Sequence, residues 1–255
     1  MANNNKDYIS QKMLYARLDD ILDYSAKGKG VGFFGFLDEK EIMLVRSYFK
    51  KEKVSGYKFY GGYDNAVRNY VAVWNGDDEP CGDDFSICGL TFRYASENKL
   101  SHRDFLGCLL GTGISKESIG DILVGDGLCV VFLKDKIAGF VENEINMVGS
   151  TRVSVKREIP LVLPAAFSLS PVEVLISSNR LDCIVSAVTR VSRSEAVSYI
   201  NNAYASVNFT PCLKITKQLD KGDILSLRGF GRYIFESEIG RTKKDRIKIL
   251  LNKYV

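Results

Sequence analysis

The segment RLDCIVSAVTRVSRSEAVSYINNAYASVN, residues 180–208, is the most informative part of the chain about its C-terminal architecture. Its apolar residues recur at helical spacing in two runs, with Leu181, Ile184, Val185 and Val188 in the first and Ala196, Val197 and Ile200 in the second. Ser192 precedes the second run and Glu195 follows three positions later, which is the spacing of a capping box. A short strand is expected at residues 205–208. The segment therefore predicts an αα corner packed on a small antiparallel sheet.

The chain beyond this corner is expected to supply more strands and a basic tail. The segment LKITKQLDKGDILSLRG, residues 213–229, predicts two strands around a tight turn at Lys221-Gly222-Asp223. The tail contains RGFGRY and GRTKKDR, whose glycines allow a backbone to approach a ligand closely. Phe230 and Tyr233 are the two candidates for stacking on an unpaired base, and a core position for Phe230 stays open as an equal alternative.

Positive charge is concentrated at this end of the molecule. Residues 178–255 hold 14 Lys and Arg against 7 Asp and Glu, although the whole chain has 35 against 31. Such a local excess of cations is expected where a polyanion docks on one module. Arg180 and Arg193 stand at the two helix starts, where guanidinium groups and helix N-termini both suit phosphate oxygens. We expect these arginines and the cations of the tail to converge on one nucleic-acid-facing surface.

The central segment has the order of a split βαβ domain. Strands are expected at residues 87–94, 120–124, 128–133 and 151–159, with helices at 101–110 and 135–147. This βαββαβ order predicts a ferredoxin-like domain over residues 81–165. RNA-recognition modules of that fold stack bases on exposed aromatics of their central strands. The strand LCVVFL lacks that aromatic pattern, so direct RNA contact and a scaffold role both stay open.

The N-terminal segment predicts a small domain of helices and strands. Helices are expected at residues 8–26 and 38–51, and strands at 57–60 and 69–74. Asp38 and Glu41 have capping-box spacing at the start of the second helix. The acidic, turn-rich residues 75–84 indicate a domain boundary, and the proline-rich residues 159–171 indicate a linker or an edge strand. The overall expectation is an α+β protein with an N-terminal α/β domain (1–80), the ferredoxin-like domain (81–165) and the C-terminal corner with its sheet (178–255).

Several kinds of site are disfavoured by the residues themselves. The six cysteines form no C-x-x-C pair, which argues against a zinc or iron–sulfur site and favours thiols in a reducing cytoplasm. His102 is the only histidine, and neither a phosphate-binding loop nor a dinucleotide-binding fingerprint is present. The N-terminus has no secretory-signal pattern, and no apolar run approaches the roughly 20 residues that cross a bilayer. We expect a cytoplasmic protein with no metal, cofactor, membrane contact or catalytic activity.

The C-terminal motifs resemble the S4-type RNA-binding domain. The matching elements, in order, are Arg180-Leu181-Asp182, Ser192-Arg193-Ser194-Glu195-Ala196, Ile200, Val207-Asn208 and Gly222-Asp223-Ile224. One position departs from the pattern, because Ala203 stands where a glycine usually follows the second helix. Such a glycine serves a left-handed helix cap, so the departure bears on the local turn.

Nearly the whole chain resembles the YlmH family. The matching segments are GGYDNAVRNYV (61–71), SHRDFLGCLLGTGI (101–114), GDILV (120–124), RGFGRY (228–233) and GRTKKDR (240–246). Val67 departs from this pattern, because the family usually has a glutamate there. The resemblance implies a bacterial, ribosome-associated RNA-binding protein, with links to rescue of stalled large subunits and to cell division. It implies rRNA or tRNA on the large ribosomal subunit as the partner, and we expect a monomer.

Ten residues are the candidates for RNA contact: Arg180, Ser192, Arg193, Asn208, Arg228, Arg232, Arg241, Lys243, Lys244 and Arg246. Two alternatives stay open. One is an RNA-modifying enzyme of the pseudouridine-synthase type, because those enzymes carry an S4-type domain and a catalytic aspartate in an R-L-D context. Here that context, with Asp182, opens the S4-type domain itself, where a local pairing or capping role is expected. The other is a protein-interaction adaptor that acts through the acidic N-terminal region.

Overall fold

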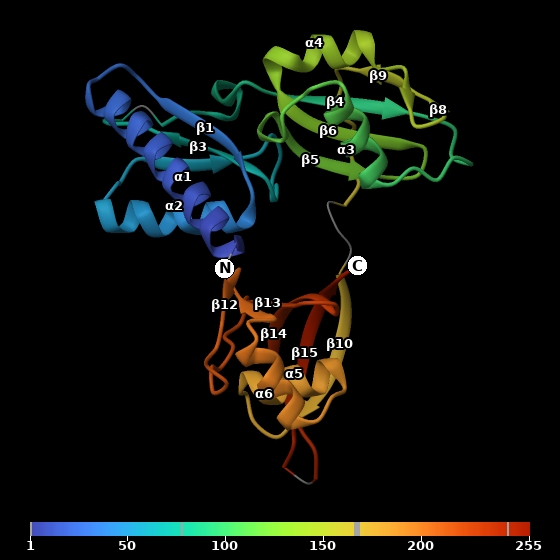
Figure 1. Ribbon diagram of the computed structural model, residues 1–255. Coiled ribbons are helices and arrows are strands. Elements are labelled where there is room, and N and C mark those ends of the chain that lie inside the picture. The colour runs from blue at the N-terminus through green and yellow to red at the C-terminus, as the bar shows by residue number, and fades with distance from the viewer. Residues whose placement is uncertain (1, 78, 166–168, 244) are drawn as a thin grey trace. The chain divides into compact units, whose positions relative to one another are not determined.

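The computed structural model describes residues 2–77, 79–165, 169–243 and 245–255, and it describes side chains from residue 11 onward. The chain forms two compact units, Met1–Ala166 and Phe167–Val255. Helices and antiparallel sheets occur in both units (Figure 1), so the predicted mixture of α and β structure is confirmed. No helix in the described part of the chain combines the length and the apolar character needed to cross a membrane.

The first half of the N-terminal unit is a three-stranded sheet with two helices on one face (Figure 1). Its elements are α1 (Ala2–Ala26), β1 (Gly32–Leu37), α2 (Glu39–Glu52), β2 (Tyr57–Tyr60) and β3 (Asn69–Val73), with the strand order β1-β3-β2. The predicted capping box of α2 is confirmed, because the Asp38 side chain accepts from the Glu41 N–H and the Glu41 side chain accepts from the Asp38 N–H. Strand β1 was not expected from the sequence.

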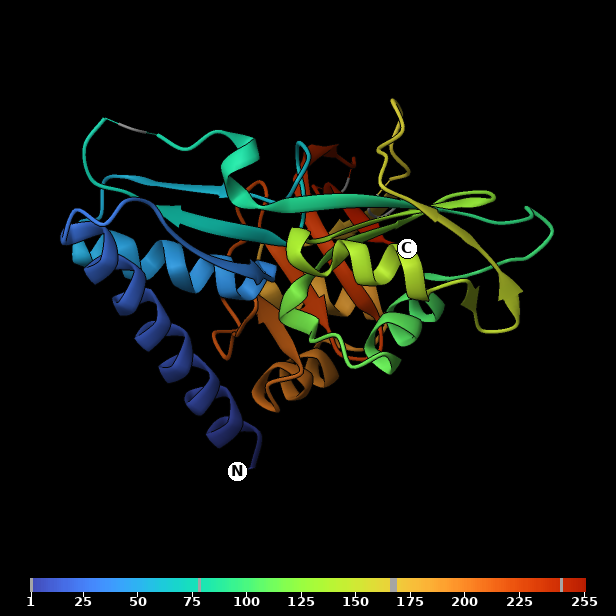
Figure 2. The ribbon, with the colours of Figure 1, turned by 90° about the horizontal axis from the view of Figure 1, so that it is seen from above.

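The second half of this unit is a four-stranded antiparallel sheet with α3 and α4 on one face (Figure 2). Its main elements are β4 (Ile87–Arg93), α3 (His102–Gly111), β5 (Ile119–Val124), β6 (Leu128–Lys134), α4 (Asp135–Glu144) and β9 (Ser154–Lys156). The strand order β5-β6-β4-β9 is the order of a split βαβ arrangement. The expected single strand at 151–159 is instead broken. A small hairpin of β7 (Met147–Val148) and β8 (Thr151–Arg152) precedes β9.

The two halves of the N-terminal unit share a hydrophobic core. Phe132 of β6 is fully buried and packs in one cluster with Phe36 and Tyr70 of the three-stranded sheet. Its ring stacks on that of Tyr63, with ring centres 4.7 Å apart. The predicted boundary near residue 80 therefore falls inside one compact unit. Residues 75–84 have the composition of a linker, but they lead into Phe85, which is 1% exposed in the shared core.

The C-terminal unit packs two helices on one face of a six-stranded sheet (Figure 1). Its elements are β10 (Leu169–Ile176), α5 (Leu181–Thr189), α6 (Arg193–Asn201), β11 (Ala205–Val207), β12 (Thr210–Pro211), β13 (Ile224–Leu227), β14 (Gly231–Arg241) and β15 (Ile247–Tyr254). The strand order is β10-β15-β14-β13-β11-β12. The predicted pair of helices and the predicted N-cap at Ser192 are both present.

Three details of this unit differ from the expectation. The sheet begins before residue 178, because β10 pairs along its whole length with β15; Pro171 is tolerated there since β10 is an edge strand. Residues 213–220 form no strand, so only one of the two strands predicted around the 221–223 turn exists. The basic tail is not a loose extension. It forms the β14–β15 hairpin, whose buried residues Tyr233, Phe235, Ile249 and Leu251 belong to the core.

Candidate nucleic-acid interface

The two arginines at the helix starts lie together on one buried carboxylate. Arg180 is the N-cap residue of α5 and Arg193 is the first residue of α6. The side chain of Asp182 is 3% exposed, and it accepts from Arg180 Nε at 3.1 Å and from Arg193 Nη2 at 2.9 Å. The side chains of Arg180 and Arg193 remain 34% and 56% exposed. We call these three residues the arginine clamp.

The electrostatics of the arginine clamp leave it positively charged. Burial alone raises the pKa of Asp182, but the hydrogen bonds from Arg193 and Arg180 outweigh burial and lower this pKa below its ordinary value. The hydrogen bond to Asp182 in turn raises the pKa of Arg193. One carboxylate against two guanidinium groups leaves a net charge of about +1. The carboxylate thus orients both guanidinium groups while part of each stays open to an anion.

Two other predicted contact residues are engaged in holding the fold. The Ser192 N–H donates to the Glu195 carboxylate at 2.8 Å, and Ser192 Oγ accepts from the Glu195 N–H at 3.3 Å. The Asn208 amide donates to Asp223 at 2.8 Å and accepts from the Ile224 N–H at 2.9 Å. Asn208 therefore fixes the β11–β12 turn to the start of β13. RNA contact by Ser192 and Asn208 stays a prediction.

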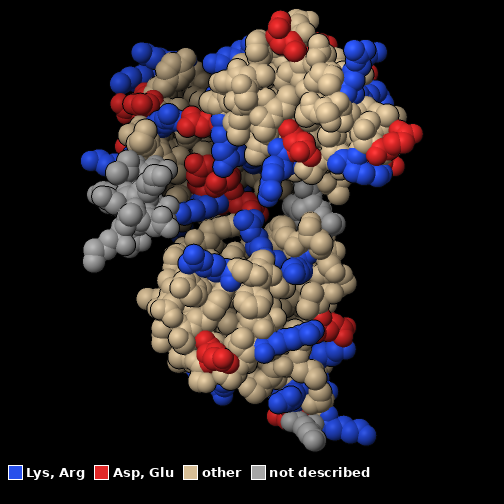
Figure 3. Space-filling model, turned by 45° about the vertical axis from the view of Figure 1, so that its right-hand side comes forward, with Lys and Arg blue, Asp and Glu red and all other residues tan. Residues whose placement is uncertain are grey.

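The cations of the tail do not converge on one surface. Arg232 lies near the start of β14, opposite Ser226, whereas Arg241 ends the same strand, opposite Ile247. Strand geometry places two such positions about 30 Å apart. Their nearness in sequence was misleading, because the residues between them form an extended strand. In Figure 3 the Lys and Arg side chains on the visible face of the C-terminal unit correspondingly form several separate patches.

One group of cations lies at the tip of the β14–β15 hairpin. Arg241 pairs with Asp245 at 2.8 Å, and both side chains are exposed. Lys243 and Arg246 are also exposed, and neither forms an ion pair with the residues that the structure describes. Lys244 lies outside the described residues. The hairpin tip thus offers cations whose charge is only partly neutralised.

The other group lies at the opposite end of β14, where arginines meet aromatic rings. The guanidinium carbon of Arg228 is 5.0 Å from the centre of the Tyr204 ring. That of Arg232 is 5.2 Å from the centre of the Phe209 ring and 5.3 Å from that of Tyr254. These three rings were not among the residues predicted from the sequence, and no local pattern marks them.

Two aromatic residues near this end have opposite environments. Phe230 is 39% exposed, as expected for a stacking residue, but Tyr233 is 4% exposed. Of the two stacking candidates only Phe230 is exposed, because β14 turns the Tyr233 side chain into the core. Alternation along the strand sends Tyr233 inward.

The four-stranded sheet offers no stacking face. One face of this sheet carries α3 and α4, and the other is covered by the three-stranded sheet. Phe132, the aromatic of the central strand β6, is 0% exposed. Contact between this part of the chain and RNA would therefore involve strand edges and loops rather than stacked bases on the sheet.

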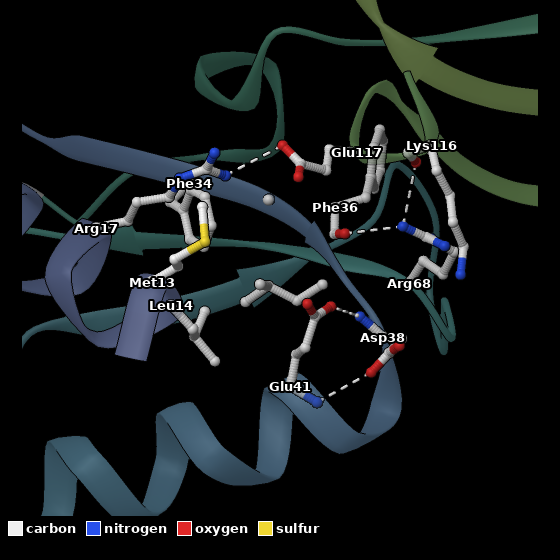
Figure 4. Close-up of a pocket in the computed structure, with 12 residues that line it drawn as sticks. Met13, Leu14, Arg17, Phe34, Phe36, Asp38, Glu41, Arg68, Lys116 and Glu117 are labelled. Carbon is white, nitrogen blue, oxygen red and sulfur yellow. Dashed lines mark hydrogen bonds and ion pairs between the residues drawn. The ribbon is translucent and has the colours of Figure 1, made fainter. Parts of the chain in front are cut away.

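The N-terminal unit contains a cavity of about 320 Å³ between α1, β1 and α2 (Figure 4). Its cations are Arg17, Arg68 and Lys116, and its carboxylates are Asp38, Glu41 and Glu117. Arg17 pairs with Glu117 at 3.1 Å, and Arg68 donates to the carbonyl oxygens of Phe36 and Lys116. The three cations are balanced by three carboxylates, so the lining of this cavity carries no excess of positive charge that would favour phosphate. Within the described ranges, no cluster of three or more His, Cys, Asp or Glu residues could hold a metal ion.

Comparisons with known proteins add independent information. Residues 80–161 match the family model described as "Putative RNA-binding domain in YlmH". A curated relative, the Ribosome-associated protein quality control protein P2 of Bacillus subtilis (strain 168), is 28% identical over 220 residues, which cover 86% of this chain and 85% of the relative. The solved structure of the Cell division protein ylmH from Streptococcus pneumoniae is similar in fold, with a TM-score of 0.52 and 16% identity over 60% of this chain and 92% of that one. These matches confirm the resemblance to YlmH proteins that the sequence motifs indicated.

Proposed function

Because this chain is similar to YlmH proteins over most of its length, we propose that it binds structured RNA on the ribosome and catalyses no reaction. The family model matched by residues 80–161 is described as an RNA-binding domain, and the relative from Bacillus subtilis is named as ribosome-associated. The chemistry of the C-terminal unit is consistent with both descriptions. Its excess of cations suits a polyanion, and phosphate contacts supply most of the affinity of such proteins.

The observation that carries the proposal is the arginine clamp. A single buried carboxylate holds Arg180 and Arg193 next to each other at the starts of two helices. Guanidinium groups in fixed orientation bind phosphate oxygens through paired N–H groups. The N-terminus of α6 adds backbone N–H groups at the same place. This arrangement is suited to the closely spaced phosphates of a folded RNA.

The same contacts disfavour a pseudouridine-synthase reaction. A catalytic aspartate must reach the substrate, whereas the Asp182 side chain is 3% exposed and bonded to two arginines. The geometry gives Asp182 the role of positioning the arginines, in line with the local pairing expected from the sequence. We therefore propose that the R-L-D motif has a structural role in an RNA-binding unit.

The finer proposal concerns the partner and the cellular role. We propose that the bound RNA is ribosomal RNA or tRNA on the large ribosomal subunit, and that a monomer binds in the cytoplasm. The names of the relatives suggest a role in ribosome-associated quality control, with a link to cell division. The matched segment, residues 80–161, holds 9 Lys and Arg against 11 Asp and Glu, so we propose that it adds contacts through its loops while the C-terminal unit supplies most of the electrostatic affinity.

Crosslinking in cells, followed by sequencing of the bound RNA, tests this function. The wild-type chain should enrich a ribosomal RNA helix or a tRNA. Arg193→Glu combined with Arg246→Glu should lose that enrichment, because both changes place a carboxylate where a phosphate would bind. The matched control is Lys29→Glu with Lys50→Glu, two exposed lysines of the N-terminal unit outside the matched segment. Enrichment of no RNA by the wild type, or equal enrichment by both double variants, would contradict the proposal.

A further inference from the structure

The turn between β13 and β14 presents an arginine and two aromatic rings to solvent. Arg228 and Phe230 lie in this turn, and Tyr204 follows α6 beside it. Tyr204 and Phe230 are each 39% exposed. Tyr199 of α6 packs edge-on against both rings, with ring centres 5.4 and 6.3 Å away. We call Tyr199, Tyr204, Arg228 and Phe230 the aromatic platform.

Hydrogen bonds hold the aromatic platform in place without a ligand. The Tyr199 hydroxyl donates to the carbonyl oxygen of Arg228 at 2.6 Å. The Tyr233 hydroxyl donates to the carbonyl oxygen of Phe230 at 2.9 Å. The Arg228 N–H donates to the carbonyl oxygen of Tyr204 at 3.0 Å. Because the turn is fixed at three points, a ligand that contacts it need not order it first.

The backbone of the turn directs Phe230 away from the core that Tyr233 enters. Tyr233, three residues after Phe230, is 4% exposed and packs in the core of the unit. Gly229 and Gly231 have φ angles of +84° and +104°, which glycine adopts without strain. They bend the turn so that Phe230 points away from that core. The turn itself, residues 228–231, contains no carboxylate.

We infer that the aromatic platform binds unpaired bases of an RNA, by stacking on Phe230 and on the face of Tyr204 that Arg228 does not cover, while Arg228 contacts the adjoining backbone phosphate. The inference rests on the proposed function, and it adds the kind of RNA and the residues that select it. Stacking on aromatic rings requires a base whose π face is free. Bases inside an A-form stem are stacked on one another, so they are not available to a flat ring on a protein surface. The platform therefore distinguishes a stem that carries unpaired nucleotides from a plain stem.

Two RNA probes test the inference on the full-length protein. One is a hairpin with an open loop, and the other is a blunt duplex of the same stem, with binding measured by fluorescence anisotropy at one salt concentration. Tyr204→Leu and Phe230→Leu each keep an apolar side chain but remove the ring. Each should weaken hairpin binding about five- to hundredfold, the range for loss of one stacked base, and leave duplex binding within about twofold. Tyr204→Phe keeps the ring and should bind both probes as the wild type does.

A matched control separates the platform from surface aromatics in general. Tyr24→Leu makes the same change at a tyrosine of α1 that is 44% exposed, and it should alter neither affinity. Equal losses for both probes, no loss for either, or a Tyr204→Phe variant as weak as Tyr204→Leu would each overturn the inference. If any of these results were found while the wild type bound both probes, the inference would fail but the proposed function would not. A wild-type protein that binds neither probe would overturn both.

Discussion

The four-stranded sheet of the N-terminal unit and the six-stranded sheet of the C-terminal unit use aromatic residues in opposite ways. Phe132 of the first sheet is 0% exposed beneath a second sheet, whereas Phe230, beside the second sheet, is 39% exposed. The charges differ as well, with 9 Lys and Arg against 11 Asp and Glu in residues 80–161, and 14 against 7 in residues 178–255. A fold that binds bases on its sheet in other proteins is here closed by its own neighbour. The exposed aromatic ring and the excess of cations both belong to the C-terminal unit.

The largest expected effect comes from replacing a phenylalanine by alanine in each of the two units and comparing the losses of stability. Phe132→Ala removes a ring from the shared core of the N-terminal unit and should lower the free energy of unfolding of that unit by about 3–5 kcal/mol. Phe230→Ala removes a half-exposed ring and should lower the stability of the C-terminal unit by less than about 1 kcal/mol. Urea unfolding followed by the fluorescence of Trp74, the single tryptophan, reports the N-terminal unit. Hydrogen exchange of residues 181–201 reports the other. Similar losses at the two positions would remove the contrast between the sheets.

A smaller effect is expected from Asp182→Asn in the arginine clamp. The change removes a buried charge that both arginines bond, and it should lower the stability of the C-terminal unit by about 2 kcal/mol at neutral pH. The pKa of Asp182 is lower in the folded protein than in the unfolded chain. The stabilisation is therefore complete above the unfolded pKa, about 3.9, and is lost as the pH falls through the folded value.

Hydrogen exchange of residues 181–201 at neutral and at acidic pH checks both parts of this prediction. The difference in stability between wild type and Asp182→Asn should be largest at pH 7 and should shrink once the pH drops below about 4. A difference that stays constant across this range would mean that the carboxylate charge contributes nothing to the clamp.

The smallest effect concerns the turn that leads from α6 to the aromatic platform. Ala203 has a φ of +57°, in the left-handed region where the S4-type pattern has glycine. Ala203→Gly relieves this strain and should raise the stability of the C-terminal unit by about 1 kcal/mol or slightly less. Ser198→Gly, in the exposed interior of α6, is the matched control and should lower it by a similar amount. The midpoints of thermal unfolding measure both, and a loss of stability in the two variants alike would contradict the strain at Ala203.

Local signals in the sequence predicted local structure well. The capping boxes at Asp38 and Ser192 were recognisable because an N-cap and its partner are only three residues apart. The order of strands and helices in the central segment followed from the same kind of periodicity. The missed strand β1 contains Gly35, whose φ is +150° and which meets the backbone of Tyr70. A strand whose backbone approaches its neighbour this closely at a glycine has no distinct local pattern in the sequence.

These local signals do not predict which residues far apart in the sequence come together in the fold. The predicted convergence of all the basic residues failed because the β14–β15 hairpin separates Arg232 from Arg241 along an extended strand. The position of Arg180 and Arg193 at two helix starts was predictable, but the carboxylate that joins them became clear only in the folded structure. Tyr204 and Phe209 were missed for the same reason, since their arginine neighbours are more than 20 positions away in the sequence.

The RNA-binding surface can be located by measuring how RNA affinity depends on salt concentration. Two full-length variants carry three changes to glutamine each, at Arg193, Lys243 and Arg246 in the C-terminal unit, and at Arg103, Lys136 and Arg152 in the matched central segment. Binding is measured with a structured ribosomal RNA fragment. The slope of log affinity against log salt should be shallower by about three for the first variant, one for each lost phosphate contact. The second variant should change this slope by less than about one. A large change in the second variant with none in the first would place the RNA on the central segment and contradict the account.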